Sequence, residues 1–237
     1  MSSLRVFMYH KISQDKSDYL TVKVSDFEQQ MNFIQSRFNV VTLKDIVQSL
    51  QNGNPLPPRA ALITFDDGYL NNYELAYPVL KKLGMSFTIF LVGRYVGMTT
   101  EHDGIEQAFL SKEHIQDMSD FGSFAYHGLG HENLMNLDES LWETYVESTI
   151  KHFETLNIKM EPCWAYTYGA FPRKSKEKMK KLGDIFSQMG IVCAFRIGNR
   201  INSWPVRQVY KIQRMDVRGN QSYWKFKLKS WLGKISI

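Results

Sequence analysis

Two spacings of apolar residues alternate along this chain of 237 residues. Short runs of apolar and β-branched residues, typical of buried strands, lie at 4–9, 39–42, 60–65, 86–92, 123–126, 163–166, 191–196 and 209–215. Between them, apolar residues recur every three or four positions, which predicts helices. One helix is expected to begin within 24–28, and the others are expected at 43–50, 72–83, 111–118, 139–156 and 175–189. The pattern therefore predicts about seven β-α units in succession.

Local signals add detail to two of these helices. In the first, Ser25 and Glu28 have the spacing of a capping box, so Ser25 is expected to cap the N-terminus. In the helix over 139–156, one face gathers the apolar residues Leu141, Tyr145, Ile150, Phe153 and Leu156. We expect that face to pack against the sheet.

Strands that alternate with helices imply a parallel, barrel-like sheet in an α/β protein. We predict one domain over residues 1–237, because barrels of this length commonly form a single domain. A basic and aromatic C-terminal helix is expected at about 221–235. In such folds the functional residues lie in the loops at the carboxyl ends of the strands.

Composition narrows the class of protein further. A hydrophobic content of 43% and an aromatic content of 14% are those of a globular chain, not a disordered one. The sequence has no apolar run of membrane-spanning length, and residues 1–15 lack the apolar segment of a secretory signal, so we expect a cytoplasmic protein. Cys163 and Cys193 lie in strand-like runs and are expected to be buried thiols.

The candidate chemistry lies where two of the expected strands end. The strand over 60–65 runs into Asp66, Asp67 and Gly68, and the strand over 123–126 runs into His127 and His131. One aspartate and two histidines can hold a divalent ion with open positions for water and substrate, while the second aspartate acts as general base. Asp-Asp-Gly also suits a simple turn, and two histidines can be unrelated surface or core residues.

Four segments together resemble the NodB-like polysaccharide deacetylases, in the form of the exopolysaccharide subgroup. Residues 64–68 (Thr-Phe-Asp-Asp-Gly) are similar to the first motif of that family, and His127 and His131 to its second motif. Residues 164–171 resemble the third motif, and the Tyr-His pair within residues 6–12 resembles an N-terminal motif of the subgroup. The resemblance covers roughly residues 4–218 and implies a distorted (β/α) barrel of about seven strands.

The resemblance also implies a role for individual residues. It makes Asp67, His127 and His131 the ligands of one divalent metal and Asp66 the general base. His10 becomes the general acid, and the backbone N–H of Tyr168 stabilises the oxyanion. Arg214 resembles the arginine that holds the base in this subgroup. Zinc is the expected metal, with cobalt, nickel and iron as alternatives for the same ligands.

The chain departs from the usual family motifs at three positions. Gly128 stands where the family has serine or threonine, so a hydroxyl that braces the metal loop is missing. Ala165 and Thr167 stand where the wider family has arginine and proline. Another group must therefore hold the base, and Arg214 is the candidate.

Aromatic residues near these motifs could line a groove for a glycan, although core packing is the ordinary reason for an aromatic residue. They are Tyr69, Tyr73, Trp164, Phe171 and Trp204. In the C-terminal helix, Trp224, Leu228, Trp231 and Ile235 share one face. We expect that face to pack on the barrel; peripheral contact with an anionic membrane is the alternative. The net charge of +5 is mild, and without a nucleic-acid-binding motif we expect no nucleic-acid partner.

The sequence thus predicts a metal-dependent hydrolase that removes N-acetyl groups from amino sugars of a polysaccharide or a lipid-linked glycan. One alternative is a C–N hydrolase that uses the same metal site on a small molecule. The other is a catalytically impaired barrel that binds a glycan without hydrolysing it.

Overall fold

Seven parallel strands close into a barrel in the computed structural model, which describes residues 2–102 and 105–233. Around the barrel the order is β1, β13, β11, β10, β9, β6 and β5, and β5 pairs with β1 to complete the ring. Their bounds are Ser2–Tyr9 (β1), Ile212–Asp216 (β13), Cys193–Ile197 (β11), Cys163–Ala165 (β10), Gly122–Tyr126 (β9), Phe87–Leu91 (β6) and Ala60–Asp67 (β5). The predicted α/β barrel of about seven strands is confirmed.

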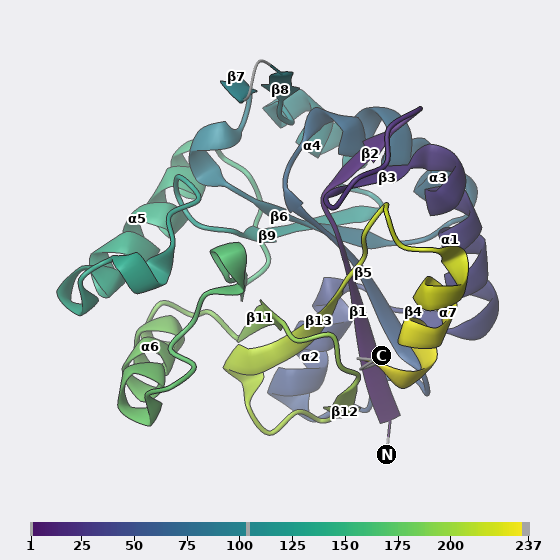
Figure 1. The fold of residues 1–237 in the computed structure, drawn as a ribbon. Coiled ribbons are helices and arrows are strands. Elements are labelled where there is room, and N and C mark those ends of the chain that lie inside the picture. Colours follow the sequence, from purple (N-terminus) through teal and green to yellow (C-terminus); the bar gives the residue numbers. More distant parts are fainter. Residues whose placement is uncertain (1, 103–104, 234–237) are drawn as a thin grey trace.

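Helices surround this barrel, with α1, α3 and α7 on one side and α5 and α6 on the other (Figure 1). Their bounds are Val24–Arg37 (α1), Leu43–Asn52 (α2), Tyr77–Lys82 (α3), Lys112–Met118 (α4), Trp142–Thr155 (α5), Lys176–Gln188 (α6) and Tyr223–Leu232 (α7). A π-helical turn, η1 (Asn72–Ala76), precedes α3, and the 3-10 turns are η2 (Gly93–Tyr95), η3 (Leu134–Asn136), η4 (Glu139–Leu141), η5 (Thr167–Gly169) and η6 (Val209–Lys211). Most helices thus form where apolar residues recur at helical spacing.

Within the described residues, six further short strands lie outside the ring. β12 (Asn202–Trp204) pairs antiparallel with β1, and β4 (Asn39–Val40) pairs parallel with β5. β2 (Lys11–Ser13) and β3 (Thr21–Lys23) form one small ladder, and β7 (Thr99–His102) and β8 (Ile105–Ala108) form another. Of these six, only β4 coincides with an expected strand.

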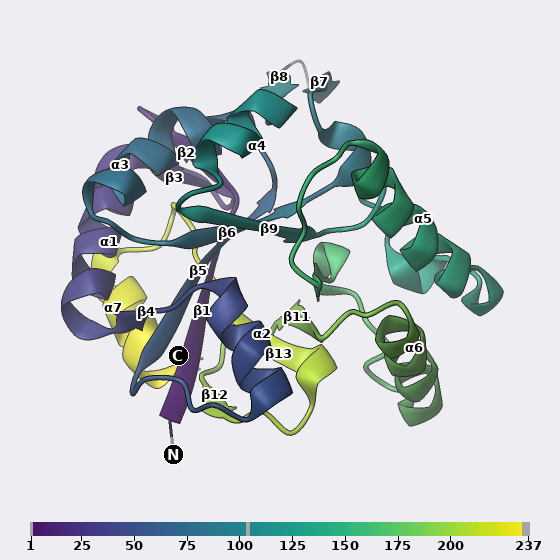
Figure 2. The same ribbon diagram turned by 180° about the vertical axis from the view of Figure 1, so that it is seen from behind.

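The pleat of the strands divides the apolar residues into two cores. Side chains that point into the barrel, such as Val6 and Leu62, pack together with Ile46 of α2. Helix α2 therefore closes the amino-terminal end of the barrel, as the view from behind shows (Figure 2). The alternate side chains, such as Phe7 and Phe65, point outward and pack under the surrounding helices. The opposite end of the barrel interior is left to polar residues.

Two local expectations were wrong. The N-cap of α1 is Lys23, which makes no side-chain capping bond, so Ser25 does not cap this helix. Helix α5 begins at Trp142, after a 3-10 turn capped by Asp138. Of its expected inward face, Phe153 is buried and Tyr145, Ile150 and Leu156 pack against the core, but Leu141 does not. The indole of Trp142 takes the core position and donates to the Leu134 carbonyl, while Leu141 is 51% exposed. Packing of the largest apolar side chain therefore decides the orientation of this helix.

The C-terminal helix α7 also presents a different face from the one expected. Phe226 and Ser230 face the barrel, and the Phe226 ring lies 5.7 Å from that of Phe7. Of the face expected to pack on the barrel, Trp231 lies 5.2 Å from the Phe38 ring, but Trp224 is 74% exposed and points outward. Position 235 of that face lies outside the described residues.

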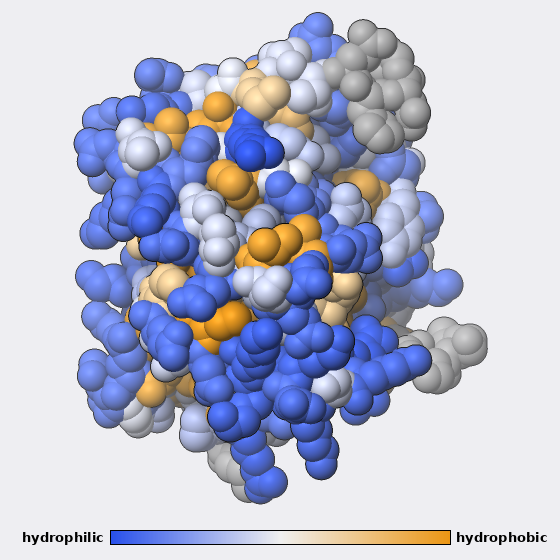
Figure 3. Space-filling view, turned by 90° about the vertical axis from the view of Figure 1, so that its left-hand side faces the viewer, coloured by the Kyte–Doolittle hydropathy of each residue, from blue (hydrophilic) through white to orange (hydrophobic). Residues whose placement is uncertain are grey.

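The surface over α5 and α6 is mainly hydrophilic, with apolar side chains in separate spots (Figure 3). Among the described residues, no helix has the length and apolar content that crossing a bilayer requires. Cys163 and Cys193 are both buried and form no disulfide with each other, and they lie opposite each other on β10 and β11.

Candidate active site

The carboxyl ends of four barrel strands deliver the residues that the sequence singled out. Asp66 and Asp67 end β5, and His127 follows β9 directly. His10 follows β1, and Arg214 lies near the end of β13, more than two hundred positions along the chain. Because all four strands are parallel and the barrel is closed, these ends meet at one mouth.

Asp67, His127 and His131 form a group that could hold a metal ion. Their ligand atoms all lie within 4.8 Å of one another. The Nε2 atom of His131 lies 3.2 Å from Oδ1 of Asp67, and the Nε2 atom of His127 lies 3.5 Å from the same oxygen. The predicted ligand set is therefore brought together by the fold.

The hydrogen bond of His127 fixes which of its ring nitrogens is free. Its Nδ1 atom lies 2.8 Å from the carbonyl oxygen of Ala165, which can only accept a hydrogen bond. The proton of a neutral His127 must therefore be on Nδ1, which leaves the lone pair of Nε2 directed toward Asp67. Ala165 serves this histidine through its backbone, so the role does not depend on its side chain.

The burial and the lowered pKa of Asp67 suit a carboxylate that binds a cation. Its Oδ1 atom is buried, and within the described part of the chain it accepts no well-formed hydrogen bond. Burial raises the pKa of Asp67, but the close approach of His131 and the nearby His127 and His10 together outweigh burial and hold the pKa well below its usual range. One ionised carboxylate and two imidazole nitrogens are a donor set that suits a divalent transition metal.

Asp66 makes a different set of contacts from Asp67. Its two oxygens accept hydrogen bonds of 2.5 and 2.8 Å from Nη1 and Nη2 of Arg214, which is completely buried. Burial raises the pKa of Asp66, but Arg214, His127 and His10 together outweigh burial and lower it. The Nε2 atom of His10 lies 4.0 Å from Oδ2 of Asp66. Arg214 is thus placed to hold the candidate base, Asp66, in position.

The structure explains why residue 128 is a glycine. Its φ of +87° favours glycine, and a Cβ atom there would overlap the hydroxyl of Tyr145. That hydroxyl accepts a hydrogen bond from the Leu129 N–H and donates one of 3.0 Å to Glu132. Glu132 in turn accepts a hydrogen bond of 2.8 Å from the Gly130 N–H. Tyr145 and Glu132 therefore brace the loop that the family's missing hydroxyl would brace.

The sequence interpretation missed both of these bracing residues. Tyr145 was expected to pack in the core because it fell in an apolar helical pattern, and Glu132 carried no signal beyond its place after His131. A contact between residues 128 and 145 depends on how α5 packs on the barrel. The spacing of apolar residues in the sequence cannot predict it.

Three residues at this mouth have strained backbone conformations. Asp67, His131 and Tyr168 all have positive φ angles, of 72°, 62° and 57°, although none of them is a glycine. Such strain persists where surrounding contacts enforce it, and it is commonest at functional sites. The Tyr168 side chain is 66% exposed, and its ring centroid lies 4.6 Å from that of His131. Tyr168 is thus placed beside the metal group and open to solvent.

Most of the aromatic residues considered for a glycan groove lie elsewhere. Trp164, Phe171 and Trp204 are buried in the cores, and Tyr73 stacks on Tyr77 and donates to Asp117. Tyr69 alone of that set lies at the mouth, where burial and the charge of Asp67 raise its pKa.

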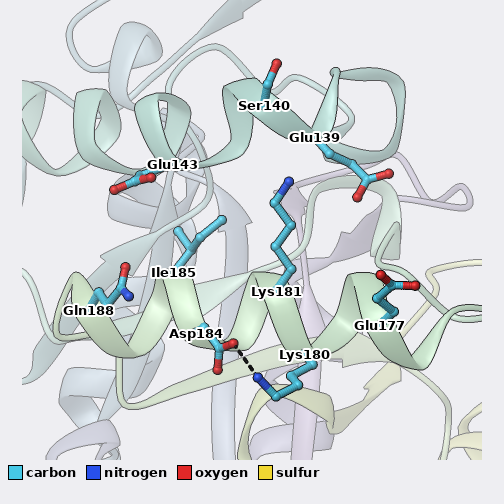
Figure 4. Close-up of a pocket in the computed structure, with 9 residues that line it drawn as sticks. All are labelled: Glu139, Ser140, Glu143, Glu177, Lys180, Lys181, Asp184, Ile185 and Gln188. Atoms are coloured by element: carbon cyan, nitrogen blue, oxygen red, sulfur yellow. Dashed lines mark hydrogen bonds and ion pairs between the residues drawn. The ribbon is translucent and has the colours of Figure 1, made fainter.

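A hollow of about 530 Å³ lies between α5 and α6, away from this mouth (Figure 4). Its walls carry side chains of both signs, among them Glu143, Glu177 and Lys181, and Lys180 pairs with Asp184. The residues that line it include no histidine or cysteine. The hollow therefore does not contain a second group of the Asp-His-His kind.

The family follows from comparison with known sequences. Residues 53–184, more than half of the chain, match the family model described as polysaccharide deacetylase. The chain belongs to the polysaccharide deacetylase family.

Individual relatives agree with this assignment. YxkH of Bacillus subtilis is 30% identical over 192 residues, which make up 80% of this chain. The poly-beta-1,6-N-acetyl-D-glucosamine N-deacetylase of Staphylococcus aureus is 28% identical over 191 residues, or 76% of this chain. This chain covers 64% of the length of each of these two relatives.

Solved structures share the fold. IcaB from Ammonifex degensii has a TM-score of 0.78 at 23% identity, with 98% of this chain and 97% of that chain covered. The Streptococcus pyogenes deacetylase PplD has a TM-score of 0.76 at 19% identity, with 96% and 97% covered. The likeness therefore extends over nearly the whole of each of these chains.

Proposed function

We propose that this chain is a metal-dependent hydrolase that removes N-acetyl groups from amino sugars of a polysaccharide or a lipid-linked glycan. One observation carries the proposal. Asp66, which forms an ion pair with the buried Arg214, lies beside an Asp-His-His group at the mouth of a barrel of this family. The name of the Staphylococcus aureus relative supports an N-acetylated sugar as the substrate.

The residues of the chain divide the reaction between them. Asp66 removes a proton from the water that attacks the acetyl carbonyl, and Arg214 keeps Asp66 ionised and in position. The backbone N–H of Tyr168 stabilises the negative charge that develops on the carbonyl oxygen. His10 then gives a proton to the sugar nitrogen as the C–N bond breaks, which yields acetate and a free amine.

Asp67, His127 and His131 would hold the metal, for which zinc is the best match to the donors and cobalt, nickel and iron are alternatives. When bound, the ion supplies Lewis acidity that polarises the acetyl carbonyl and lowers the pKa of water. Metal analysis of protein purified without chelator, followed by removal and reconstitution with each ion in turn, tests the choice of metal.

Acetate release from defined substrates tests the activity. Soluble N-acetylglucosamine oligomers of increasing length should release acetate, chelator should stop the release, and a divalent ion should restore it. A small-molecule C–N hydrolase would instead act on free N-acetylated monosaccharides or amides and lose activity as the oligomer grows. A barrel that only binds glycan would retain the oligomers without releasing acetate.

We also propose that α7 brings the protein into peripheral contact with an anionic membrane. The helix turns Trp224, Leu228 and Leu232 outward, with Leu232 66% exposed. Lys227 lies over the Trp224 ring at 4.4 Å, and a lysine beside an exposed tryptophan is typical of helices at a membrane surface. A ten-residue helix is only about 15 Å long. Its face is therefore far smaller than the roughly 800 Å² that each partner buries in a stable protein interface.

Sedimentation with lipid vesicles tests this contact. The protein should bind vesicles that contain an anionic phospholipid, and Leu228→Lys should weaken that binding. Leu141→Lys, at an exposed leucine on η4, is the matched control. Equal losses for both variants, or a dimer in solution that Leu228→Lys disrupts, would contradict the proposal.

A further inference from the structure

Three arginines, Arg173, Arg196 and Arg200, lie beside the mouth of the barrel, and none has an acidic partner among residues 2–102 and 105–233. Arg173 and Arg196 approach the same ring, Phe171, at 5.7 and 5.3 Å from its centroid. Arg200 is exposed in the loop after β11, four residues beyond Arg196, and burial together with the charges of Arg173 and Arg200 lowers the pKa of Arg196. Among the described residues, no carboxylate lies within 4.0 Å of any of the three guanidinium groups.

Three other arginines of this chain have an acidic partner. Arg214 pairs with Asp66, Arg218 with Asp216, and Arg94 approaches Glu132. Arg196, by contrast, directs Nη1 to the carbonyl of its neighbour Ile197, and its Nε–H is buried with no acceptor within the described part of the chain. Like charges held together with a buried free donor cost free energy unless an anion offsets them.

The segment that follows adds positive charge at the same place. Lys174 and Lys176 are exposed at the start of α6, and neither forms an ion pair among the described residues. The one acidic residue of the first turn, Glu177, lines the hollow between α5 and α6 instead (Figure 4). An anion at this position would therefore meet several cations and no competing carboxylate from that turn.

The arginine group lies close to the candidate active site. Phe171 is three residues from Tyr168, a separation of at most about 11 Å along the chain. A Cβ atom at Gly169 would touch Ile197, so the loop that carries Tyr168 packs against the end of β11 next to Arg196. Ile197 pairs in turn with Arg214, the partner of Asp66. A glycan that passes over Tyr168 would thus meet the arginines within a short distance.

We propose that Arg173, Arg196 and Arg200 form an anion-binding subsite for an oxyanion, a phosphodiester or a carboxylate, carried by the glycan substrate. This inference rests on the proposed function and makes the preferred substrate an acidic glycan. Guanidinium groups suit the task because their fixed N–H donors match the oxygens of phosphate and carboxylate, and their charge does not titrate.

Kinetics on neutral and acidic substrates test the subsite. The double variant Arg173→Gln/Arg200→Gln changes two exposed residues and should fold. It should raise KM about tenfold on an acidic glycan, with kcat unchanged and with no change on a neutral N-acetylglucosamine oligomer. Hyaluronan fragments supply the carboxylate, and a polymer of N-acetylglucosamine phosphate supplies the phosphodiester. The control Arg37→Gln/Arg207→Gln removes the same charge from exposed positions elsewhere.

Direct binding separates this inference from the proposed function. Inorganic phosphate should shift the NMR resonance of the Arg196 Nε–H group, and the double variant should abolish the shift. An equal rise in KM on neutral and acidic substrates, or an unmoved Arg196 resonance, would overturn the subsite. If the wild type releases no acetate from either substrate but phosphate still shifts Arg196, the proposed function fails and the anion site stands.

Discussion

Gly128 and Tyr145 share one small volume in the loop between His127 and His131, so neither can be changed without affecting the other. The Tyr145 hydroxyl occupies the place of a Cβ atom at residue 128 and bonds to Leu129 and Glu132. Partners that orient a metal loop commonly change metal affinity by about 10–100-fold when they are removed. The two residues together therefore replace the hydroxyl that relatives of this family usually carry in the motif.

Tyr145→Phe should weaken metal binding about tenfold while the protein stays folded, because the loop loses the brace and no core volume. Titration of the metal-free protein with zinc measures the change. Tyr73→Phe, which removes a hydroxyl bonded to Asp117 on the exposed surface, is the control and should leave metal affinity unchanged.

The shared volume can be tested by combining changes. Gly128→Ala should destabilise the protein by about 2–4 kcal/mol, from the positive φ and the overlap with Tyr145. In the Tyr145→Phe background the same change should cost less, because the overlapping hydroxyl is gone. Strictly additive free energies of unfolding would contradict this account of the loop.

At the scale of the element, a local capping motif succeeds in one helix and fails in another. Thr42 caps α2, accepts a hydrogen bond from the Asp45 N–H and completes a capping box with it. Ser25 has a similar sequence context but lies inside the first turn of α1 and makes no capping bond. The difference arises because α1 follows β3 with no intervening turn, so the helix starts before the serine.

Thr42→Ala should therefore lower the free energy of unfolding by about 1 kcal/mol, whereas Ser25→Ala should change it little. Urea denaturation of the two variants makes the comparison. A larger loss for Ser25→Ala than for Thr42→Ala would show that the capping assignment is reversed.

The strands and helices of the barrel were largely predictable, because their apolar spacing is a local property that the pleat and the helical turn both preserve. The orientations of α5 and α7 were not predictable in the same way. Each is set by one large side chain, Trp142 or Phe226, that fits a space made by distant elements. The short strands of the β7–β8 hairpin carry too few residues for a periodic pattern.

At the scale of the whole molecule, closure of the barrel joins residues from opposite ends of the chain. Pairing of β1 with both β5 and β13 brings His10 and Arg214 to the same carboxylate, Asp66. The strand-end motifs predicted Asp66, Asp67 and the two histidines, because parallel strands end at one rim. The roles of His10 and Arg214 were predicted only from the family resemblance, because no local sequence pattern shows which strands pair to close a barrel.

If His10 protonates the leaving amine, His10→Ala should lower turnover of an N-acetylated glycan with metal content and folding unchanged. The loss should be much smaller on nitrophenyl acetate, whose leaving group needs no proton. Rates on both substrates report the difference. Equal losses on the two would make His10 a positioning residue.

The central claim is that one aspartate of the adjacent pair holds the metal and the other activates water. Metal content and acetate release from N-acetylglucosamine oligomers, measured together for Asp66→Asn and Asp67→Asn, test it most directly. Asp66→Asn should keep close to one equivalent of metal and lose about 10²–10⁴-fold in rate, whereas Asp67→Asn should lose both metal and activity. Metal lost from Asp66→Asn and retained by Asp67→Asn would contradict the account.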